Sequence, residues 1–121
     1  MPPSRRSPSP EVAALRTATE DICAQLLRQV RQQARLIRSG DAGQLTEADV
    51  ERMAADFVAA ARAQLDAAVQ SCQSPADDPE LQAFRREAAQ LMAAGARQAA
   101  ADLRTAWQAQ HDKAVGRRWR R

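Results

Sequence analysis

The chain has 121 residues, with two Phe, two Trp, no Tyr and a formal net charge of +3 at pH 7. This length suits a single domain, and the absence of any run of about 20 apolar residues excludes a membrane-spanning segment. The 28 alanines and the many Gln, Arg, Leu and Glu favour helix, whereas strand-forming aromatic and β-branched residues are scarce. We therefore expect an all-α fold.

The first nine residues contain only Pro, Ser and Arg after Met1, which predicts a disordered basic leader over residues 1–9. No apolar stretch follows that would make this segment a signal peptide. We therefore expect a cytoplasmic protein in which Cys23 and Cys72 are reduced.

A first helix is predicted over residues 10–39, with Ser9 as its N-cap and Pro10 in its first turn. Gly40 provides the left-handed residue that commonly ends a helix. Helical periodicity places one apolar stripe on this helix, made of Val12, Leu15, Thr19, Ile22, Leu26, Val30 and Ile37. A short turn over residues 40–43 should follow.

The second helix, predicted over residues 46–72, has the clearest start signal in the chain. Thr46 can cap it, Asp49 lies three residues later in a capping-box position, and Leu45 can pack on Val50. The expected buried face comprises Val50, Met53, Phe57, Ala61, Leu65, Ala68, Val69 and Cys72.

The third helix is predicted over residues 79–115, with Asp78 as its cap and Gly116 as its stop. Its expected inner face comprises Leu81, Phe84, Ala88, Leu91, Met92, Gly95, Ala99, Leu103 and Ala106. The small residues on this face should allow close packing. Phe57 and Leu91 lie centrally on their predicted inner faces, so truncation of either should be costly.

The two short connections predict an up-down-up three-helix bundle of long, Ala-rich helices over residues 10–115. The alternative is an extended helical hairpin that completes its core by dimerising, since an apolar stripe does not distinguish a core from a homodimer interface. Helix lengths predict that residues 106–121 overhang the bundle. The same register separates the two cysteines by about 12 Å, which is too far for a disulfide.

Charge is divided unevenly along the chain. All 15 acidic residues lie between Glu11 and Asp112, and the 12 basic residues of segment 11–115 leave this body with a net charge of −3. The leader contributes two Arg, and the tail, residues 116–121, contributes four. The body is thus acidic, and both ends are cationic.

Two groups of residues are candidates for binding nucleic acid or another partner. One is an Arg stripe on the first helix, with no acid between Asp21 and Asp41, which could form an electrostatic track for phosphates; the simpler interpretation is a solvated polar face. The other is the Arg/Trp tail, in which Arg can pair with phosphate and Trp can stack on a base. A frayed soluble end, an acidic protein surface or an anionic membrane are the alternatives for the tail. The candidate residues are Arg28, Arg31, Arg35, Arg38, Arg117, Arg118, Trp119, Arg120 and Arg121.

No constellation for catalysis, metal binding or a cofactor is visible in the sequence. His111 is the only His and is expected on a helix surface, and the cysteine spacing is not that of a zinc site. The four Gly do not form a phosphate-binding loop. Asp102, near the inner face of the third helix, is expected to pair with an Arg.

These observations favour a non-enzymatic helical binding or regulatory protein that contacts nucleic acid through its tail and its Arg stripe. The competing hypothesis is a protein–protein adaptor or inhibitor that docks through the bundle without nucleic acid. The two differ in their expected response to salt, because only phosphate binding releases counterions.

Overall fold

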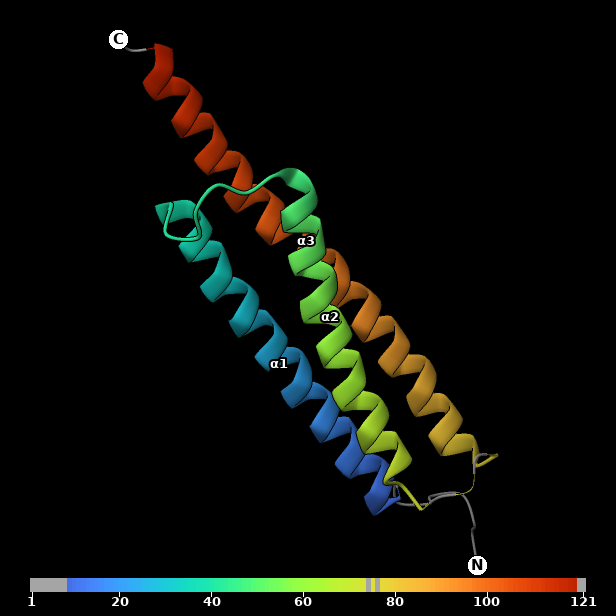
Figure 1. The fold of residues 1–121 in the computed structure, drawn as a ribbon. Coiled ribbons are helices and arrows are strands. Elements are labelled where there is room, and N and C mark those ends of the chain that lie inside the picture. The colour runs from blue at the N-terminus through green and yellow to red at the C-terminus, as the bar shows by residue number, and fades with distance from the viewer. Residues whose placement is uncertain (1–8, 74, 76, 120–121) are drawn as a thin grey trace, which may run out of the picture.

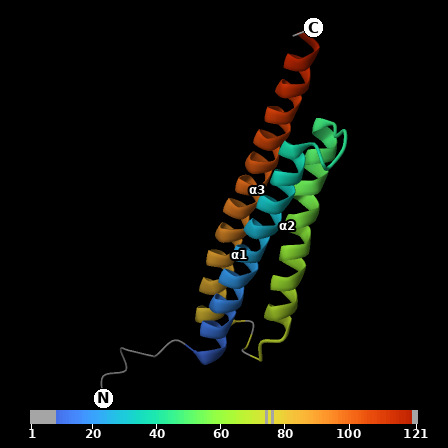
Figure 2. The same ribbon diagram turned by 90° about the vertical axis from the view of Figure 1, so that its left-hand side faces the viewer.

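The computed structural model describes residues 9–73, 75 and 77–119, and of residues 117–119 only the backbone. Its three helices are α1 (Pro10–Ser39), α2 (Glu47–Gln70) and α3 (Pro79–Trp119), and the described segments contain no strand. The helices lie side by side and alternate in direction, and each packs against both others (Figures 1 and 2). The all-α, up-down-up three-helix bundle is thereby confirmed. No helix within these segments is long and apolar enough to cross a membrane.

The ends of α1 are set by two different interactions. Gly40 has a φ of 84°, and its backbone N–H donates to the Ile37 carbonyl at 3.2 Å, as expected for a left-handed stop. Ser9 occupies the N-cap position, but its side chain makes no capping hydrogen bond. The predicted N-cap residue is therefore confirmed by position, without a hydrogen bond from its side chain. The backbone N–H of Ser9 donates to Glu80 Oε2 at 2.9 Å, which ties the start of α1 to the start of α3.

The start of α2 is the predicted capping box. The Asp49 backbone N–H donates to Thr46 Oγ1 at 3.1 Å, and the Thr46 backbone N–H donates to Asp49 Oδ2 at 2.9 Å. The helix ends at Gln70, two residues before the predicted end at Cys72. Cys72 remains half-buried against the core, and neither it nor Cys23 forms a disulfide.

The core combines a few large side chains with many alanines. Phe84, Leu26 and Leu103 are the largest fully buried side chains. The apolar stripe of α1 is confirmed, apart from Ile22, which is half-buried, and Ala34 adds a further buried position. The buried alanines at the helix contacts, which let the backbones approach closely, are Ala34, Ala54, Ala61, Ala88, Ala99 and Ala106.

The buried face of α2 contains Val50, Ala61 and Leu65, as predicted, but differs from the prediction at two positions between them. Ala54 and Val58 are 4% and 7% exposed, whereas Met53 and Phe57 are half-buried at the margin of the core. Both pairs have helical spacing, so periodicity alone does not separate them. Phe57 therefore contributes to the core but does not lie at its centre.

Leu91 was expected in the core, and this prediction is wrong. Leu91 is 49% exposed, while the next residue, Met92, is 3% exposed. Adjacent helical residues point about 100° apart, so only one of them can face the core directly. Met92 lies in line with buried Ala88 and Ala99, and Leu91 is turned to the α1–α3 edge near Arg16 and Glu20.

The third helix continues through Gly116, where we predicted that it would end. Gly40 and Gly43 are the two described glycines with positive φ, so the Gly116 backbone does not take the left-handed conformation of a helix stop. Glycine costs only about 1 kcal/mol inside a helix. The helix therefore extends to Trp119.

The overhang of α3 also begins later than residue 106. Ala106 is fully buried, and Trp107 Nε1 donates to the Leu45 carbonyl at 2.7 Å. A Cβ added to Gly40 would lie 3.1 Å from Gln110 Nε2. The α1–α2 connection thus packs on α3 as far as Gln110, and α3 projects beyond that level (Figure 1).

We predict a sharp contrast between two leucines of α3. Leu103→Ala should lower the free energy of unfolding by about 2–5 kcal/mol, because the side chain is fully buried. Leu91→Ala, with half of its side chain in solvent, should cost less than about 1 kcal/mol. Urea unfolding followed by circular dichroism measures both, and equal losses would contradict the assigned face of α3.

A second prediction concerns the capping box at low pH. Two hydrogen bonds lower the pKa of Asp49 from its ordinary value of 3.8. The larger effect comes from the backbone N–H of Thr46, and the smaller comes from the Thr46 side chain. A lowered folded-state pKa stabilises the fold above the ordinary value, and this stabilisation is lost as the pH falls through the lowered pKa. The protein should therefore exceed Asp49→Asn in stability at neutral pH, and the difference should shrink below pH 3.8. A difference that urea titrations find constant with pH would contradict this role.

Candidate nucleic-acid interface

The predicted Arg stripe lies along the outer side of α1. Its four members, Arg28, Arg31, Arg35 and Arg38, are all exposed, and they lie away from the buried side chains of Val30 and Ile37. Within the segments that the structure describes, no ion pair involves any of the four. Their guanidinium groups are thus accessible to an external anion.

Two other arginines form ion pairs with glutamates of the same chain. Arg16 Nε lies 3.3 Å from Glu87 Oε2, which links α1 to α3. Arg104 contacts Glu47 and Glu51 of α2 at 3.9 and 3.3 Å. The stripe differs from these arginines in that no partner must be displaced before it binds an anion.

The parallel course of α1 and α3 brings the stripe and the end of α3 to the same end of the bundle. Figure 1 shows that α1 ends beside the point where α3 begins to project. The nine helical residues after Gln110 extend about 13 Å at 1.5 Å per residue. Lys113, which is exposed, lies on this projection. We call the stripe and residues 113–121 together the cationic end.

The tail lies at the limit of the described chain. The backbone of Arg117, Arg118 and Trp119 is helical, but their side chains, and all of Arg120 and Arg121, lie outside the described part. The predicted contact residues of the tail are therefore located only by the direction of α3. The described backbone of residues 117–119 continues the axis of α3 beyond the packed part of the bundle.

Acidic residues near the cationic end are bound by neutral groups. Asp102 Oδ1 accepts from Gln98 Nε2 at 2.8 Å, and none of the ion pairs among the described residues involves Asp102, so its predicted pairing with an Arg is wrong. Asp112 Oδ1 accepts from Gln108 Nε2 at 3.0 Å, and Asp41 Oδ2 accepts from Ser39 Oγ at 2.8 Å. Among the described residues, none of these three carboxylates forms an ion pair with an arginine of the stripe.

His111 and the cysteines do not form a reactive cluster. His111 is exposed, and its ring stacks on Trp107 with centroids 5.1 Å apart and planes inclined by 17°. Burial raises the pKa of the Cys23 thiol, which reduces the fraction of nucleophilic thiolate. Among the residues described, no group of three or more His, Cys, Asp or Glu could hold a metal ion.

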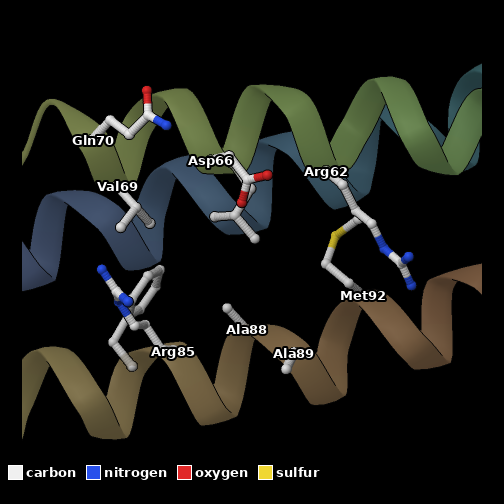
Figure 3. Close-up of a pocket in the computed structure, with 10 residues that line it drawn as sticks. Arg62, Asp66, Val69, Gln70, Arg85, Ala88, Ala89 and Met92 are labelled. Atoms are coloured by element: carbon white, nitrogen blue, oxygen red, sulfur yellow. The ribbon is translucent and has the colours of Figure 1, made fainter.

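A groove between α2 and α3 is a feature that the sequence reasoning missed. Figure 3 shows one section of it, where Arg62 and Asp66 face Arg85, Ala88 and Met92 across the gap between the helices. This section measures about 460 Å³, and a second section of about 570 Å³ continues toward the start of α2. The available signal was the exposed series Ala55, Ala59 and Ala63, which repeats every four residues.

Comparison of the chain with models of protein families, with curated proteins and with solved structures gave no match.

Proposed function

We propose that the chain is a small, non-enzymatic helical protein that binds nucleic acid at its cationic end. The observation that carries this proposal is the shared location of the projecting end of α3 and the Arg stripe, whose members form no ion pair with any described residue. Guanidinium groups bind phosphate oxygens in a forked geometry, and this favours phosphate contacts over base recognition.

The charge distribution supports binding by one end of the molecule. The body carries more acidic than basic residues, so a polyanion is repelled by most of the surface. The cationic end combines five exposed basic side chains, Lys113 and the four of the stripe, with the four arginines that the sequence places in the tail. A nucleic acid is therefore attracted to this end in preference to the acidic faces of the bundle.

The stripe makes a testable contribution to salt-dependent binding. In Arg31→Gln/Arg35→Gln, affinity for a labelled oligonucleotide should fall, and the slope of log affinity against log salt should decrease by about 1.4–1.8 if each Arg contacts one phosphate. The matched control is Arg86→Gln/Arg97→Gln, which removes the same charge from exposed positions on α3. Fluorescence anisotropy over a salt series measures both, and equal effects of the two variants would contradict a localised site.

The tail is tested by changing Arg117, Arg118, Arg120 and Arg121 to Gln in the full chain. Affinity should fall while the unfolding midpoint stays the same, because the described packing of α3 on the rest of the bundle ends at Gln110. If Trp119 stacks on a base, Trp119→Ala should weaken single-strand binding by about 1–3 kcal/mol and duplex binding less. Unchanged binding in the four-Arg variant would remove the tail from the proposed interface.

The competing proposal is a protein–protein adaptor that docks through the bundle. It predicts no nucleic-acid binding at about 50 mM salt, where phosphate contacts are strong. It also predicts that a protein partner copurifies after nuclease treatment. That pair of results would replace the nucleic-acid proposal.

A further inference from the structure

The groove between α2 and α3 is a continuous apolar surface on the side of the bundle away from α1. Its two sections share Arg62 and Asp66, so they form one channel along α2. The buried side chains of Leu65, Phe84 and Met92 line the first section. Alanines of both helices line the second, namely Ala54, Ala55, Ala59, Ala63, Ala96 and Ala100.

A helix is the shape that suits such a groove. The alanines of the second section leave room for an approaching backbone, and helices pack by fitting the ridges of one into the grooves of another. A helix from another molecule that lies along this channel would contact α2 and α3 together. The charged residues that line the groove favour one occupant, a second copy of α2.

Arg62 and Asp66 lie one turn apart on α2, at the place where the two sections of the groove meet. Within the described chain neither of them forms an ion pair. When a second α2 lies antiparallel, with a two-fold axis level with residue 64, Arg62 of each copy faces Asp66 of the other. The charge pattern is thus complementary to itself, as an interface between identical subunits requires.

The same register also matches small and large apolar residues. Residues 59 and 69 are equidistant from residue 64, so Ala59 faces Val69 of the partner subunit. Both residues line the groove, and Val69 is half-buried in the single chain. One axis therefore pairs opposite charges and also places a branched side chain against an alanine gap.

We infer that two copies of the chain form a symmetric dimer in which α2 of each lies in the α2–α3 groove of the other. The dimer leaves α1 and its Arg stripe on the outer surface. It is independent of the proposed nucleic-acid function, because it uses the opposite face of the bundle.

Charge-exchange variants test the stated pairing. Arg62→Asp and Asp66→Arg each place two like-charged pairs across the axis, and each should weaken self-association at least tenfold. An equimolar mixture of the two variants restores two opposite-charge pairs and should form a heterodimer. The double variant, Arg62→Asp/Asp66→Arg, reverses both charges and should dimerise within a few-fold of the parent. Sedimentation equilibrium measures each dissociation constant, and circular dichroism checks that the helices are retained.

Two neighbouring alanines provide a steric test that leaves these charges unchanged. Ala59→Arg fills the groove opposite Val69 of the partner subunit and should abolish dimerisation. Ala60→Arg changes an exposed residue that does not line the groove, and it should leave the dissociation constant within a few-fold of the parent.

Three results would overturn the inference. One is a parent protein that is monomeric at about 100 µM, a concentration at which a dimer of even 10 µM affinity is mostly assembled; another protein would then be the occupant of the groove. The second is unchanged dimerisation in both single charge variants. The third is a mixture of those variants that fails to form a heterodimer although each variant has lost self-association. The proposed Arg62–Asp66 pairing predicts that the mixture forms this heterodimer.

Discussion

The three helices lie close together because alanine occupies so many of the positions where they meet. Phe84, Leu26 and Leu103 are the largest fully buried side chains, and buried alanines on all three helices allow the backbones to approach one another around them. Gly95 shows how closely α3 packs on α1, since a Cβ added to this residue would lie 3.4 Å from Leu26 Cδ2. A chain with so few large side chains depends on close packing of its helices to enclose a core, and its exposed surface is also rich in alanine.

The alanines on the exposed sides of α2 and α3 explain why the groove between these helices exists. Ala54 and Ala61 face the core, while Ala55, Ala59 and Ala63, only one or two residues away, form a wall of the groove. An alanine can occupy a buried or an exposed position of a helix with little difference in stability, because its small side chain contributes little free energy on burial. The few polar residues of the groove, Arg62 and Asp66 among them, therefore carry much of the information about what can dock there.

The parts of the fold that could be predicted are those fixed by local chemistry. The capping box at Thr46 and the left-handed Gly40 require specific residues within a few positions, and both were found where the sequence predicts them. Leu91 and the exact face of α2 depend on how one helix rotates against two others, which no local pattern determines. Of the candidate site, the exposed stripe was predictable from periodicity, but its position at the same end as the projecting α3 follows from the parallel course of two helices.

The projecting end of α3 differs from the rest of the molecule in its resistance to local unfolding. Residues 111–115 are exposed, so their helical hydrogen bonds are supported mainly by the helix itself. Breaking them exposes little apolar surface, whereas opening α3 near Leu103 requires the whole core to separate. Amide exchange should consequently slow along α3 from its C-terminal end toward the bundle. The last turns can unwind and reform at little cost in free energy, which allows this end to adapt its shape to a surface that it meets while the bundle remains unchanged.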